Sequence, residues 1–127
     1  NATPLTDEDI LELKGKTLML NIGMVLKKFE NENPVPPTYN DIYEMTRRAW
    51  KLDTRRLKKI TKVFAVSGGV VKEVFDVAFK EWENDTEEVN RKAFSKITPN
   101  KPNPENDKYK GRDVKNYCLR RWTVRYI

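Results

Sequence analysis

Residues 63–79 constrain the fold of this chain most strongly, because two runs rich in valine and phenylalanine flank Ser67-Gly68-Gly69. Glycines at such a turn permit the positive φ angles that tight hairpins require. The second run also alternates its side chains with the period of two that is typical of a strand. The segment therefore predicts an antiparallel strand pair, and Phe79–Trp82 is either a further short strand or a bend of the same one.

Signals for short elements precede this hairpin. Thr6 and the three acidic residues after it predict a helix that ends at Gly15. The apolar run Lys16–Leu26 then predicts a largely buried strand, in which Gly23 marks a bulge or a close backbone approach.

Two further helix starts lie between this strand and the hairpin. Thr38 and Asp41 have the spacing of a capping box and predict a helix over Tyr39–Ala49. Asp53 or Thr54 can cap a short second helix across RRLKKI.

The C-terminal part of the chain carries weaker signals. The polar, proline-containing stretch 83–107 predicts a long surface loop. Gly111 precedes a predicted short helix, Arg112–Tyr117, and a final strand, Trp122–Ile127. Alternation along that strand would turn Trp122, Val124 and Tyr126 inward and the arginines outward.

Together these elements predict an α+β fold with a small, curved, mainly antiparallel sheet and three or four short helices. At 127 residues the chain is expected to form a single domain over 1–127. Strand–helix alternation is not sustained, which argues against a doubly wound α/β fold.

Composition excludes several classes of function. The chain has no histidine and one cysteine, Cys118, so Ser-His-Asp and Cys-His catalysis and finger-type zinc sites are excluded. We expect no cofactor and no metal site. No apolar run approaches the roughly 20 residues that span a bilayer, and no secretory signal is evident. These features predict no membrane partner and a cytoplasmic location.

Positive charge is concentrated in two short stretches. Residues 46–62 carry a net charge of +7 and residues 108–127 carry +6, so the rest of the chain sums to −7. Each stretch contains a tryptophan, Trp50 or Trp122. Cations that displace counterions from phosphates and planar groups that stack on bases are both typical of nucleic-acid binding.

The order of several short motifs resembles a pattern found in many small bacterial and phage-borne proteins. IYEMTRRAW, FAVSGGVVKEVFDV, YKGRDV and RYI carry the resemblance, which covers roughly residues 18–127. Its layout is similar in outline to PUA-like small barrels, which bind RNA or read modified bases, so the resemblance implies that a PUA-like barrel is possible. The positions that correspond to the pattern are Tyr43, Glu44, Thr46, Arg47, Trp50, Glu73, Tyr109, Gly111, Arg125 and Tyr126.

We expect a nucleic-acid-binding module, for RNA or DNA, that has no catalytic residues. The phosphate contacts are predicted among the cations of the two stretches: Arg47, Arg48, Arg55, Lys58, Lys59, Lys62, Arg120, Arg121 and Arg125. In a helical reading of 55–62, four of them would share one face: Arg55, Lys58, Lys59 and Lys62.

The candidates for base contact are Tyr43, Glu44, Trp50, Glu73 and Tyr109. Structural roles remain open for the same residues. The tryptophans can be core anchors, the glutamates can pair with arginines, and Arg47 or Arg48 can offset a helix dipole. Two other functions also remain open: a protein-interaction or inhibitor domain whose basic face binds an acidic protein, and an enzyme or reader that acts on a nucleobase, modified or not.

Overall fold

The computed structural model describes residues 2–48, 50–85, 87, 91–94, 102–117 and 122–127. Its centre is a mixed four-stranded sheet of order β3-β2-β1-β6. The strands are β1 (Thr17–Asn21), β2 (Lys62–Ser67), β3 (Val70–Asp76) and β6 (Val124–Tyr126). A separate antiparallel pair joins β4 (Trp82–Asn84) to β5 (Lys92–Phe94).

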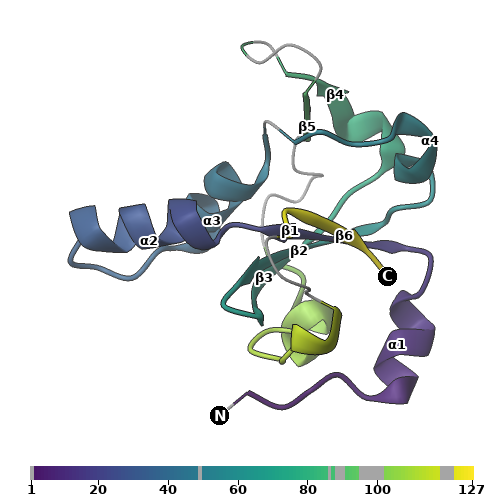
Figure 1. Ribbon diagram of the computed structural model, residues 1–127, viewed down its shortest axis with the longest axis horizontal. Helices are drawn as coiled ribbons and strands as arrows, with labels where there is room; N and C mark the ends of the chain where they lie inside the picture. The colour runs from purple at the N-terminus through teal and green to yellow at the C-terminus, as the bar shows by residue number, and fades with distance from the viewer. Residues whose placement is uncertain (1, 49, 86, 88–90, 95–101, 118–121) are drawn as a thin grey trace.

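The predicted α+β class is confirmed, and the described strands of the main sheet form an open sheet instead of a closed barrel. Antiparallel pairs link β2 to β3 and β1 to β6, whereas β1 and β2 run parallel. The parallel pair is connected by α2 (Gly23–Glu32), α3 (Tyr39–Thr46) and α4 (Thr54–Leu57) (Figure 1). Parallel strands require such a long crossover, because the chain must return to the same end of the sheet before the second strand begins.

Both faces of the sheet are covered. One core cluster contains Leu18, Leu20 and Val63 and packs beneath α2, α3, α4 and β5. The other contains Met19 and Phe64 and packs against α1 (Asp7–Leu13) and the segment around Tyr109. Side chains that alternate along β1 and β2 therefore enter opposite clusters, which explains why these strands read as continuous apolar runs.

The hairpin and the helix starts agree with the sequence. Gly68 and Gly69 have φ angles of 61° and 74° at the β2–β3 turn. Thr38 and Asp41 form the capping box of α3, and a second capping box at Thr6 starts α1. Asp53 caps α4 through its side chain. These contacts form within a few residues, so local sequence determines them.

The predicted strand Lys16–Leu26 is wrong in its second half. β1 ends at Asn21, and α2 begins at Gly23. The Asn21 side chain accepts a hydrogen bond from the Gly23 backbone N–H at 2.9 Å, which turns the chain out of the sheet. A polar side chain that accepts a hydrogen bond from the backbone two residues later competes with the backbone hydrogen bonds between strands.

Several other predicted elements are shorter than expected or differ in type. α3 ends at Thr46 instead of residue 49, and the predicted helix Arg112–Tyr117 is a 3-10 turn over Lys115–Tyr117. Phe79–Glu81 is a 3-10 turn that leads into β4. The final strand is confirmed only over Val124–Tyr126.

The prediction of a long surface loop over 83–107 is wrong for part of that range. β5 lies within it, and its Phe94 is fully buried in the first core cluster. A 3-10 helix, Pro104–Lys108, also lies within it and buries the side chain of Asn106. Packing against distant residues has overridden the polar composition of the stretch.

Candidate functional site

The two basic stretches meet where α4 lies beside β6. Leu57 anchors α4 in the core with no exposed surface, and the side chains of Arg55 and Arg56 on the same turn remain exposed. Tyr126 on β6 is held by pairing of that strand with β1, where it lies opposite Leu18. A short basic helix and a basic edge strand are thereby held side by side.

Two adjoining pockets form at this junction, with volumes of about 520 Å³ and about 320 Å³. Both are lined by Asp53, Arg56 and Tyr126, so they lie next to one another. We call the two pockets together the basic groove, and its cations are Lys51, Arg55, Arg56, Lys59 and Arg125.

Arg56 and Tyr126 form the centre of the basic groove. The guanidinium carbon of Arg56 lies 4.0 Å from the centroid of the Tyr126 ring, in cation–π contact. Burial raises the pKa of the Tyr126 phenol, while the Asp53 main chain and the Arg56 charge oppose the shift. The buried hydroxyl nevertheless makes no hydrogen bond of good geometry among the described residues.

Positive charge in the basic groove is nearly uncompensated. Asp53 is the one acidic side chain that lines it within the described part of the chain, and its nearest cation is Arg55, with Nε at 3.7 Å. Arg56 and Lys59 make no ion pair with any described residue. The Nε of Arg125 is buried and also lacks a hydrogen-bond partner there. The exposed side chains of Arg56 and Lys59 therefore remain available for an anionic ligand.

Other predicted phosphate contacts are engaged inside the protein. Arg48 holds Asp85 through two hydrogen bonds, of 2.9 and 2.6 Å, and Glu87 through a third. These acids raise the pKa of Arg48 further above its usual range. Arg47 donates its Nε–H to the Phe94 carbonyl at 3.2 Å. Both arginines therefore connect the end of α3 to the β4–β5 region.

The predicted helical face of Arg55, Lys58, Lys59 and Lys62 is not formed. α4 ends at Leu57, and Lys62 is the first residue of β2. The chain leaves the helix because the backbone of Lys62 bonds to the Lys16 carbonyl as the parallel pair with β1 begins. The Lys62 ammonium then binds Asp76 and Asn106, each at 2.7 Å.

Three predicted cations lie outside the basic groove or outside the described residues. Lys58 is exposed, and its ammonium is 5.9 Å from the centroid of the Phe79 ring. Arg120 and Arg121, like Cys118, are outside the residues that the structure describes.

The predicted base-contact residues are spread through the molecule. Tyr43 is buried between Phe75 and Phe94, and Trp50 is half-buried with its Nε1–H bonded to the Thr46 carbonyl at 2.6 Å. Glu73 is buried and pairs with Lys110 at 2.9 Å. Glu44 is exposed on α3. None of these residues lines the basic groove.

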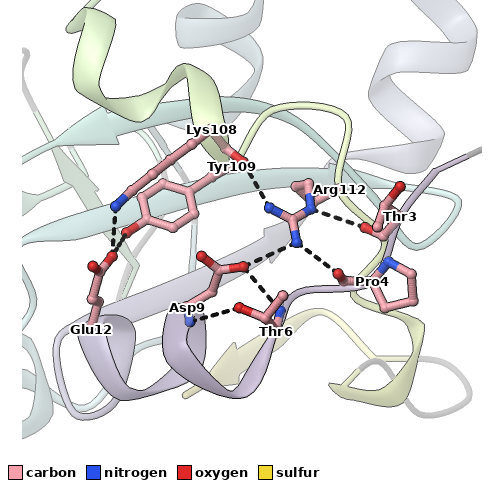
Figure 2. Close-up of polar contacts among 8 residues, drawn as sticks. All are labelled: Thr3, Pro4, Thr6, Asp9, Glu12, Lys108, Tyr109 and Arg112. Atoms are coloured by element: carbon pink, nitrogen blue, oxygen red, sulfur yellow. Dashed lines mark hydrogen bonds and ion pairs between the residues drawn. The ribbon is translucent and has the colours of Figure 1, made fainter.

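Tyr109, the last predicted base contact, belongs to a polar network that joins α1 to the end of the 3-10 helix Pro104–Lys108 and the residues after it. Figure 2 shows its hydroxyl donating to Glu12, which also accepts from Lys108, both at 2.7 Å. The same figure shows Arg112 bonded to the Thr3 and Pro4 carbonyls and to Asp9. Cations of the second basic stretch, Lys108 and Arg112, thus stabilise the N-terminal segment.

This network also shifts the pKa values of its acids. The backbone N–H of Thr6 lowers the pKa of Asp9, and burial opposes it. Hydrogen bonds from Lys108 and Tyr109 lower the pKa of Glu12. Hydrogen bonds that form in the folded protein therefore stabilise both carboxylates in their charged form.

Asp76 has a comparable role at the end of β3. Its carboxylate accepts hydrogen bonds from Lys62 at 2.7 Å, Asn103 at 2.8 Å and Asn106 at 3.1 Å. Burial opposes its ionisation, but these hydrogen bonds and the Lys62 charge outweigh burial and lower the pKa of Asp76.

A pH dependence of stability follows from Asp76. Because its pKa is lower in the folded than in the unfolded chain, the stabilisation is full above the unfolded value of about 4 and is lost as pH falls through the folded value. We expect the wild-type free energy of unfolding to fall more steeply below about pH 5 than that of Asp76→Asn, measured by urea unfolding. An identical acid limb for the two proteins would contradict this role.

Sequence reasoning missed two members of the basic groove, Lys51 and Arg56, and the pairing of Arg56 with Tyr126. The available signals were weak. Arg56 lies in the first basic stretch, and Tyr126 belongs to the RYI motif, but they are 70 positions apart in the sequence. Only the pairing of β6 with β1 brings them together.

Neither a metal centre nor a membrane span is found in the described part of the chain. No group of three or more His, Cys, Asp or Glu residues there could hold a metal ion. No described helix is long and apolar enough to cross a membrane.

Comparison with protein-family models, with curated proteins and with solved structures finds no match in any of the three.

Proposed function

We propose that this protein binds nucleic acid through the basic groove, as a binding module without catalytic activity of its own. The observation that supports it most directly is the meeting of Lys51, Arg55, Arg56, Lys59 and Arg125 around two adjoining pockets with Asp53 as the one lining acid among the described residues. A groove with one sign of charge concentrates anionic ligands and gains affinity by releasing their counterions.

The internal ion pairs make this groove distinctive. Arg48, Lys62, Lys108, Lys110 and Arg112 each bind a carboxylate of the protein itself. Their charges are therefore balanced before any ligand arrives. Among the groove cations, only Arg55 lies within ion-pair distance of a described carboxylate, that of Asp53. We include a cytoplasmic location in the proposal, since a single cysteine suits a reducing compartment.

Fluorescence anisotropy with labelled RNA and DNA strands of about 16 nucleotides tests the proposal. If the five groove cations contact phosphates, log Kd should rise with log salt at a slope of about 3.5 between about 50 and 200 mM, since each contact to a single strand contributes about 0.7. Absence of binding at the lowest salt, or binding independent of salt, would refute it.

Poly-glutamate serves as the competitor that separates nucleic acid from an acidic protein. Nucleic-acid binding predicts that poly-glutamate of matched charge competes much more weakly than unlabelled RNA, because RNA also presents sugars and bases, whereas poly-glutamate presents only carboxylates. Equal competition would instead favour the alternative in which the groove receives an acidic protein.

A further inference from the structure

We infer that the basic groove is specific for single-stranded nucleic acid and stacks one unpaired base on the outer face of the Arg56 guanidinium. This inference rests on the proposed function and names the form of nucleic acid that the groove takes. It starts from the contact between Arg56 and Tyr126, with the guanidinium carbon 4.0 Å from the ring centroid.

A guanidinium is planar: its N–H donors lie at its edge, and its two faces can stack on rings. The guanidinium carbon of Arg56 lies over the Tyr126 ring, and the residue as a whole is exposed. In the proposed arrangement, the base stacks on the guanidinium face that is remote from this ring. The N–H donors lie in the guanidinium plane and form no hydrogen bond with a described residue. The face can therefore accept a base while the edge donates to a phosphate.

The stack is held in position before any ligand binds. Leu57, next to Arg56 in the sequence, is fully buried and anchors α4. Tyr126 is anchored by β6, which pairs with β1, and its hydroxyl is buried. A preorganised platform loses little conformational entropy on binding, which favours a planar ligand over a mobile one.

Cations line both of the pockets to which Arg56 and Tyr126 contribute. Arg55 and Lys59 line the larger pocket, whereas Lys51 and Arg125 line the smaller one. Arg56 and Tyr126 line both. Phosphates that precede and follow a stacked nucleotide would thus each meet a pair of cations.

Single strands fit this arrangement and duplexes do not. In a duplex the base faces are covered by their neighbours, so only phosphates, sugars and base edges are presented. Every unpaired base has an accessible face, and stacking on aromatic or guanidinium planes is typical of single-strand recognition.

A matched pair of conservative variants tests the role of Arg56. Arg56→Lys keeps the charge but removes the plane, and Arg91→Lys makes the same change at an exposed arginine that does not line the groove. Anisotropy should show an affinity for single strands about tenfold weaker for Arg56→Lys, with less than about a twofold change for Arg91→Lys. The weaker duplex binding should not differ between the two variants.

A second measurement uses the unaltered protein, so it does not depend on how a variant folds. An oligonucleotide with abasic sites keeps its phosphates and loses its bases, and it should bind about tenfold more weakly than the intact strand. Equal affinity for the two oligonucleotides, or equal losses for the two lysine variants, would overturn the stacking inference.

The outcomes distinguish this inference from the proposed function. Salt-dependent binding with equal affinity for single strands, abasic strands and duplexes would support phosphate binding by the groove and would exclude base stacking. Absence of salt-dependent binding to every oligonucleotide would refute both.

Discussion

Reversal of three charges in the basic groove, by Arg55→Glu, Arg56→Glu and Lys59→Glu together, should weaken binding to a single-stranded oligonucleotide at least about a hundredfold at about 100 mM salt. Each substitution removes a favourable phosphate contact and adds a repulsive charge. Loss of Arg56 also removes the platform over Tyr126. The slope of log Kd against log salt should fall by about 2, or about 0.7 for each lost contact.

A control with the same net charge separates the groove from the overall field of the protein. Lys27, Lys28 and Lys72 are exposed on α2 and β3 and do not line the groove. Their combined replacement by glutamate gives a protein of equal formal charge, which should lose less than about tenfold in affinity. Similar losses in the two triple variants would show that net charge, and not the groove, governs binding.

The second large effect concerns folding, and Phe94→Ala should lower the free energy of unfolding by about 3–5 kcal/mol. Phe94 is fully buried, with ring centroids 5.9 Å from Tyr43, 6.0 Å from Phe75 and 5.0 Å from Trp82. Its removal leaves a cavity between α3, β3 and the β4–β5 pair that these aromatic rings cannot fill without moving. Urea unfolding monitored by circular dichroism measures the loss.

Phe79→Ala is the matched control, because Phe79 is 39 % exposed. The same chemical change there should cost less than about 1 kcal/mol. Had residues 83–107 formed only a surface loop, Phe94→Ala would be equally mild. A loss below about 1 kcal/mol for Phe94→Ala would therefore contradict its place in the core.

Elements set by local contacts were predictable from the sequence. The glycines at the β2–β3 turn and the capping residue Thr38 act on neighbours within a few positions. Their signal is therefore present in a short window of sequence. The α+β class followed from these elements, because it needs only their type and order.

Errors arose where a distant partner decided the local conformation. β1 ends at Asn21, whose side-chain N–H donates to the distant Trp122 carbonyl at 3.1 Å, although the apolar run continues through Leu26. Phe94 forms a buried strand inside a polar stretch because Trp82 and Tyr43 lie nearby in space. A sequence window contains neither the partner nor the free energy of its burial.

The candidate site divides in the same way. Charge concentration marked both basic stretches. Arg55, Lys59 and Arg125, which were predicted as phosphate contacts, line the groove for which binding is proposed. Arg47, Arg48 and Lys62 were grouped with them, yet they contact the Phe94 carbonyl or carboxylates of the protein. Counting charges cannot tell a paired cation from an unpaired one, because pairing depends on acids far away in the sequence.

By itself, the sequence determined the chain's α+β class, its hairpin, its capped helices and the amount of positive charge in each basic stretch, since all of these depend on composition or on near neighbours. The tertiary structure alone decided which cations stay unpaired and that Arg56 lies on Tyr126. The reason is physical: the groove exists only when β6 pairs with β1 and Leu57 is buried, and both contacts join residues far apart in the sequence.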